Sequence, residues 1–133
     1  MNSLKTRAIE DRGVAAGEFA LVLPILLVLV FGIIDFGLYY YNDLLLTQTA
    51  RDAARYVSVG DVAEANDVID NLTASLVSTT FTRSITYPAG VEDQGAEATV
   101  ALTGTYKTLT PLPQLAGLGE TFAINATAKM RRE

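Results

Sequence analysis

Residues 12–35 read RGVAAGEFALVLPILLVLVFGIID and decide the architecture of this chain of 133 residues. Residues 19–34 carry no charge, and leucine, valine and isoleucine fill every helical face without a polar stripe. Counted through the aromatic residues to Tyr41, the run of about 23 residues is long enough to cross a hydrocarbon core of about 30 Å as a helix. We therefore expect a membrane span at residues 19–41.

A cleaved secretory signal is an alternative explanation for an apolar run close to a basic N-terminus. Such a signal ends in small residues of the A-x-A type, where signal peptidase cuts. Here the chain continues as DFGLYYYND, without such a site. The sequence therefore favours an anchor that ordinary signal peptidase leaves in place.

The charges on either side of the apolar run predict its orientation. Lys5, Arg7 and Arg12 precede it, which favours a cytoplasmic N-terminus and an extracytoplasmic C-terminus. In this orientation the polar and aromatic residues that close the run lie at the outer interface. They are Asp35, Phe36, Tyr39, Tyr40 and Tyr41.

The helical pattern continues beyond the expected membrane span. Residues 42–59 contain neither proline nor glycine, and their small and apolar positions recur at helical spacing. These positions are Leu46, Ala50, Ala53 and Val57. The sequence predicts one helix over residues 15–59, with a kink at Pro24, where a backbone donor is missing. Its alanine-rich stripe permits close packing against a sheet or another helix.

The rest of the chain changes from helical to strand periodicity. Gly60 suits a helix C-terminus, and Asp61 with Glu64 forms a capping-box-like start for a second helix that reaches about residue 78. Apolar and polar residues then alternate in residues 81–87, 98–109 and 121–130, which predicts three half-buried strands. Helices followed by strands indicate an α+β fold with a three- to four-stranded, mainly antiparallel sheet.

Three segments follow from this pattern. Residues 1–13 form a cytoplasmic leader, residues 14–59 the long helix, and residues 60–133 a small extracytoplasmic head. A sheet in so small a head has one face that needs cover, because the head alone buries little apolar surface. The alanine-rich stripe of the long helix is the expected cover.

The composition gives little support to catalysis. The chain has no cysteine and no histidine, and it contains no phosphate-binding glycine loop. Its net charge of −5 argues against a nucleic-acid partner. Glu92, Asp93 and Glu97 form an acidic cluster, but they lack the ligand spacing of an EF-hand and are expected to be a solvated loop. We expect neither an enzyme nor a cofactor or metal site.

Glu18 requires a more specific explanation than the helix dipole, which favours any acid near a helix N-terminus. The string GVAAGEF, residues 13–19, resembles the processing site of type IV pilins and pseudopilins. In those families a prepilin peptidase cuts after a glycine, and a glutamate stands fifth after the cut. The resemblance implies cleavage between Gly13 and Val14, and assigns Glu18 to neutralising the new α-amino group of an adjacent subunit.

A finer resemblance is to the TadE-like minor pilins of the Tad, or Flp, type IV pilus system. EFALVLPILLVLVFGIIDFG looks like the N-terminal signature of that family, including Phe19 after the glutamate, Pro24 and Asp35. TQTARDAARY looks like its continuation, and TAKMRRE like its C-terminus. Gly17 is a second glycine and leaves a cut before Glu18 open.

The resemblance implies a protein of the bacterial inner membrane that later enters a pilus or reaches the cell surface. Its implied partners are the membrane, the prepilin peptidase, other minor and major pilins, and the pilus assembly platform. Its implied role is pilus assembly or tip initiation, with Glu18 and Phe19 in subunit assembly. The alternative is an unprocessed single-span anchor that carries an extracytoplasmic binding module.

Overall fold

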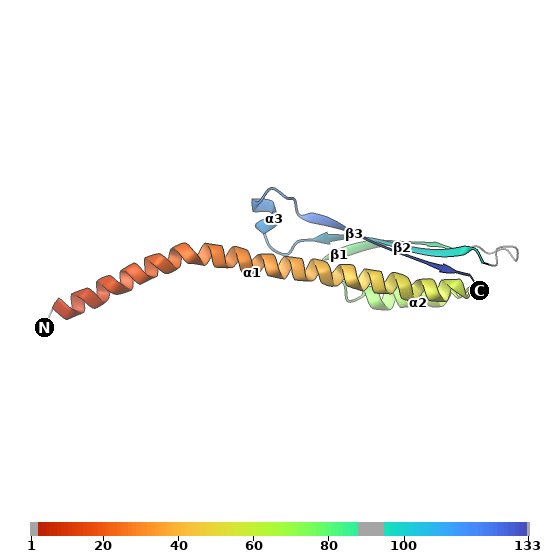
Figure 1. Cartoon of the computed structure of the whole chain (residues 1–133), viewed down its shortest axis with the longest axis horizontal. Helices are drawn as coiled ribbons and strands as arrows, with labels where there is room; N and C mark the ends of the chain where they lie inside the picture. The colour runs from red at the N-terminus through yellow and green to blue at the C-terminus, as the bar shows by residue number, and fades with distance from the viewer. Residues whose placement is uncertain (1–2, 88–94, 133) are drawn as a thin grey trace. The chain divides into compact units, whose positions relative to one another are not determined.

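The computed structural model describes residues 3–87 and 95–132, and for residues 3–12 it describes the backbone alone. The elements along the chain are α1 (Ser3–Ser58), α2 (Val62–Thr73), β1 (Thr79–Thr86), β2 (Glu97–Lys107), α3 (Leu112–Leu115) and β3 (Thr121–Arg131) (Figure 1). A long apolar helix, a second helix and an antiparallel sheet confirm the predicted α+β fold. Glu92 and Asp93 of the acidic cluster lie outside the described residues.

The chain divides into two compact units, Met1–Ile34 and Asp35–Glu133. The boundary between the two units falls inside α1. The reason is that residues 35–58 of α1 belong to the packed core of the second unit. The predicted helix is therefore real, but its second half is part of the head.

The first unit is an uncovered apolar helix. α1 begins at Ser3, upstream of the predicted start near residue 15, and every side chain from residue 13 to residue 30 is exposed. The most apolar 18-residue window has a mean hydropathy of 2.8, and α1 is the one helix of the described residues that is long and apolar enough to cross a membrane. Leucine and isoleucine exposed on all sides suit a lipid environment and not water.

The sheet of the second unit has the order β1-β2-β3, and both pairs are antiparallel. Side chains on β2 alternate between buried and accessible along its length, as the period of two predicts. Val100, Leu102 and Tyr106 point into the core, whereas threonines such as Thr103 and Thr105 face outward. One face of the sheet is therefore dry and the other is polar.

The dry face of the sheet packs against the helices of the same unit. The buried residues of α1 include the whole predicted stripe: Leu46, Ala50, Ala53 and Val57. α2 contributes Ala65 and Ile69, and the sheet adds Val100, Leu102 and Ile124 to the same core. The stripe and the sheet thus share one core, which confirms that the alanine-rich stripe supplies the cover.

α2 begins as predicted but ends early. The Asp61 side chain accepts a hydrogen bond from the Glu64 amide at 3.0 Å, so Asp61 is the N-cap. The helix ends at Thr73 and not near residue 78, because the backbone of Val77 is bonded to the Asn42 side chain of α1. Ser78 then takes a positive φ of 51°, which turns the chain into β1.

The predicted strands are confirmed with small changes at their ends. β1 begins at Thr79 and is linked to α2 by an ion pair between Arg83 and Asp70 at 2.7 Å. β2 ends at Lys107 and not at residue 109, because the Leu109 amide turns away from β3 and donates to the Asp35 carboxylate of α1 at 3.0 Å. The short helix α3 inside this connection has no counterpart in the sequence prediction.

Gly104 provides a test of the close packing between helix and sheet. A Cβ atom at this position of β2 would lie 2.9 Å from Leu46 Cδ1 and 3.3 Å from Thr79 Cγ2. Because Leu46 is fully buried, it has little space into which to move. We expect Gly104→Val to lower the free energy of unfolding by about 2 kcal/mol, measured by urea titration of the full chain in detergent with circular dichroism.

Thr103→Val is the matched control, since Thr103 neighbours Gly104 on the outward face of the same strand. It introduces the same β-branched side chain without touching Leu46. Equal stability of the two variants would contradict the close approach of α1 to β2.

Candidate functional site

The residues predicted for processing and assembly lie on the uncovered part of α1. Val14 and Phe19 are 63% and 60% exposed, and a Cβ atom at Gly13 would meet nothing within 4 Å. Gly17 is equally open, and among the described residues Glu18 has no ion-pair partner. These side chains are therefore all available to other molecules. Pro24 lies within α1, which continues on both sides of it.

Asp35 is placed quite differently, because its carboxylate is buried against the end of β2. It is 8% exposed and accepts hydrogen bonds from the Tyr106 hydroxyl at 3.3 Å and the Leu109 amide at 3.0 Å. Thr110 donates to it through its amide at 3.4 Å and also through its hydroxyl. The sequence predicted that Asp35 lies at the outer interface, and the structure shows that it binds the head of its own chain.

The Tyr106 hydroxyl is part of this site and stays protonated. Burial raises the pKa of Tyr106 above its usual value of 10.0, and the negative charge and hydrogen bond of Asp35 raise it further. The phenol therefore acts as a donor across the physiological pH range. The carboxylate is satisfied by four donated hydrogen bonds, which is what a buried acid requires.

The aromatic residues predicted for the outer interface divide into two groups. Tyr39 turns into the head, where its ring meets Tyr106 and Phe122 edge to face at centroid distances of 6.1 and 6.3 Å. Its hydroxyl donates to the Ala123 carbonyl at 3.4 Å. The other aromatic side chains of these turns point outward and are 70%, 53% and 45% exposed: Phe36, Tyr40 and Tyr41.

Asn42 is a second polar anchor on the buried face of α1, and sequence reasoning missed it. Its side chain donates to the Val77 carbonyl at 2.8 Å and accepts from the Val77 amide at 3.1 Å. Thr49, also fully buried, donates to the Leu45 carbonyl of its own helix at 2.7 Å. Asp35, Asn42 and Thr49 recur every seven residues, and this repeat could have shown that the buried stripe begins at Asp35.

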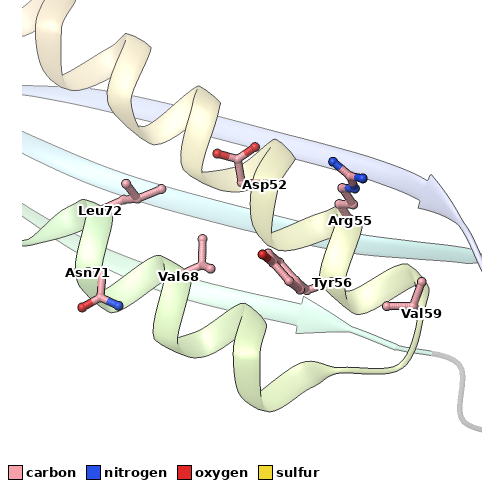
Figure 2. Close-up of a pocket in the computed structure, with 7 residues that line it drawn as sticks. All are labelled: Asp52, Arg55, Tyr56, Val59, Val68, Asn71 and Leu72. Carbon is pink, nitrogen blue, oxygen red and sulfur yellow. The ribbon is translucent and has the colours of Figure 1, made fainter.

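An open groove of about 570 Å³ lies between α1 and α2. Figure 2 shows Tyr56 and Val68 pointing into the space between the two helices. The remaining lining residues mix charge with apolar surface: Asp52, Arg55, Val59, Asn71 and Leu72. Within residues 13–87 and 95–132, whose side chains the structure describes, no group of three or more histidine, cysteine or acidic residues could hold a metal ion.

Residues 13–55 match the family model of TadE-like proteins. The match begins at Gly13, the predicted cleavage residue, and ends at Arg55 in the last turn of α1. It thus covers the apolar segment and the stripe as far as Ala53, and it stops before Val57 and α2. The predicted resemblance to TadE-like proteins is confirmed over this part of the chain. Neither a curated protein nor a solved structure matches the chain.

The Asp35 site leads to a prediction about how α1 holds the β2–β3 connection. Asp35→Ala leaves the Tyr106 hydroxyl and the Leu109 and Thr110 donors without their acceptor. Because buried donors that lose a charged acceptor are costly, we expect the free energy of unfolding to fall by about 3 kcal/mol. Amide hydrogen exchange of the full chain in detergent should show faster exchange at Leu109 and Thr110.

Asp67→Ala on the exposed side of α2 serves as the control and should leave both amides protected. Unchanged protection in Asp35→Ala would show that the connection holds its shape without the carboxylate.

Proposed function

We propose that this chain is a minor pilin of a Tad-type pilus, processed by a prepilin peptidase and needed for pilus assembly or tip initiation. The observation that carries the proposal is the TadE-like match over residues 13–55, which falls on an uncovered apolar helix. The match indicates a protein associated with the Tad pilus, and the helix indicates a single-pass membrane anchor. Processing, orientation with the N-terminus inside, and a place in the pilus are the further steps of the proposal.

The exposed apolar surface of α1 supports the proposal that this helix moves from the lipid bilayer into a bundle of pilin helices. Leu21, Ile25 and Ile33 are 77%, 70% and 65% exposed, and large apolar side chains of this kind gain about 1.5–3 kcal/mol each on leaving water. Lipid can cover them in the membrane, and the equivalent helices of other minor and major pilins can cover them in a filament. One surface thus serves both states, with the assembly platform acting between them.

Glu18 is suited to the change between these two states. At the membrane surface its exposed carboxylate faces water, at no cost in desolvation. Among packed helices it loses that water and requires a positive partner. Cleavage after Gly13 supplies one, because it creates an α-amino group at Val14 that a neighbouring subunit can present.

The helical state of residues 13–17 adds a requirement for cleavage. Gly13 and Gly17 both lie within α1, whereas a peptidase acts on an extended segment. A glycine inside a helix costs about 1 kcal/mol relative to alanine. Two of them one turn apart weaken the hydrogen bonding of this segment, so that it opens locally when the peptidase binds.

Gly13 can be tested by intact mass. In cells with the cognate prepilin peptidase, the wild-type chain should lose the mass of residues 1–13, whereas Gly13→Leu should keep its full mass because the side chain blocks the peptidase. Both glycines face open space, so neither substitution disturbs packing.

Gly17→Leu is the matched control and should be cut after Gly13. Cleavage lost in Gly17→Leu but kept in Gly13→Leu would move the site to Gly17. A full-length wild-type chain in the presence of active peptidase would support the alternative, an unprocessed membrane anchor with a binding module.

Glu18→Ala separates processing from assembly. The variant should still be cut, yet its amount in sheared pili should fall about a hundredfold, since an unpaired buried charge costs about 3 kcal/mol. Quantitative immunoblotting of pili and membranes measures this ratio. Asp67→Ala, which removes an exposed acid from α2, should enter pili normally. Normal incorporation of Glu18→Ala would remove the assembly role of this residue.

A further inference from the structure

The connection between β2 and β3 exposes large apolar side chains. Leu109, Leu115 and Leu118 are 56%, 81% and 68% exposed, and residues 108–119 contain no charged side chain. Connections on a water-facing surface are normally polar, and a cluster of exposed leucines marks a surface that contacts something apolar.

The connection has a defined shape. The Leu115 amide donates a hydrogen bond to the Pro111 carbonyl at 3.1 Å. The Ala116 amide donates to the Leu112 carbonyl at 2.9 Å, and these two bonds form the turn of α3. The Leu118 amide donates to the Pro113 carbonyl at 2.8 Å. Because the backbone is bonded internally, the leucines are presented from a fixed scaffold.

Asp35 determines which turn of α1 the β2–β3 connection lies beside. It directly follows Ile34, the last residue of the uncovered apolar unit, and it accepts hydrogen bonds from Leu109 and Thr110. The connection is therefore held at the first residue of α1 that belongs to the head. Figure 1 shows α3 at the end of the sheet where β2 ends and β3 begins.

The neighbouring turn of α1 carries aromatic residues on its outer side. Phe36 and Tyr40 are exposed, and their rings stack at a centroid distance of 6.4 Å. Exposed aromatic rings at the end of a membrane-spanning helix are typical of the interface between lipid and water. The leucines of the connection and these rings thus belong to the same end of the head.

We propose that the β2–β3 connection is a membrane-contacting loop, in which Leu109, Leu115 and Leu118 insert into the lipid interface beside the point where α1 leaves the membrane. Lipid is the occupant that this position favours, because a hydrogen bond joins the loop to the residue that follows the apolar segment. The inference requires the membrane anchor alone and is independent of processing and of entry into a pilus.

The loop can be probed in the full chain with a single label, since the natural sequence contains no cysteine. Ala116→Cys places an environment-sensitive fluorophore between the exposed leucines and leaves them intact. Ala63→Cys, exposed on α2, is the matched control. Both proteins are reconstituted into nanodiscs of phosphatidylethanolamine and phosphatidylglycerol, with or without a lipid that carries a nitroxide quencher at its headgroup.

We expect the Ala116 label to emit at shorter wavelength than the Ala63 label and to lose much of its emission to the quencher. Leu115→Ser with Leu118→Ser in the Ala116→Cys background should reverse both effects. Water-like emission at Ala116, or equal quenching with and without the leucines, would overturn the proposal. So would shielding that requires added pilin subunits, since the leucines would then form a subunit interface.

Discussion

The arrangement of the head depends on a carboxylate buried on the face of a helix. Burial removes water from the Asp35 carboxylate, and four hydrogen bonds from Tyr106, Leu109 and Thr110 compensate for it. Buried acids are costly unless they are fully bonded, so the chain after β2 must lie where it can supply the donors. The carboxylate thereby fixes the end of β2, the start of the β2–β3 connection and the point where α1 changes from an uncovered helix to a packed one.

The same helix meets two different demands within 56 residues. Its first part is apolar on all sides and has no core of its own. Its second part has one buried face, on which small side chains such as Ala50 and Ala53 pack against the sheet while Asn42 bonds the backbone of Val77. The change occurs without a break in the helix, and it is made by side chains alone.

Much of this fold could be predicted because its signals are periodic. The alternation in β2 and β3 and the stripe from Leu46 to Val57 predicted the correct faces, and Asp61 predicted the start of α2. The burial of Asp35 was not predicted, because an acid beside an apolar run suggests an interface with water. Its burial depends on donors more than 70 residues away in the chain, which local patterns do not reveal. α3 was missed for a related reason, since a four-residue helix that contains one proline and follows another has no periodicity.

For the candidate processing site, the sequence contributes more to the assignment than the fold does. Gly13, Val14 and Glu18 were assigned from the resemblance of residues 13–19 to the pilin processing site, and the structure adds that they lie exposed on a helix. The partners proposed for them belong to other molecules, so the fold of one chain contributes little to their assignment. The roles of Asp35 and Asn42, by contrast, can be recognised only from their contacts in the folded structure.

The contacts between α1 and the sheet also have a mechanical consequence. Asp35 bonds the end of β2, and Leu46 packs against Gly104 further along the same strand, so the helix and the strand run alongside each other. A pull along α1 is therefore parallel to the layer of contacts between them. The hydrogen bonds of Asp35 and Asn42 and the packing of Leu46 bear such a load together, in shear, whereas a pull across the layer would peel them apart one at a time.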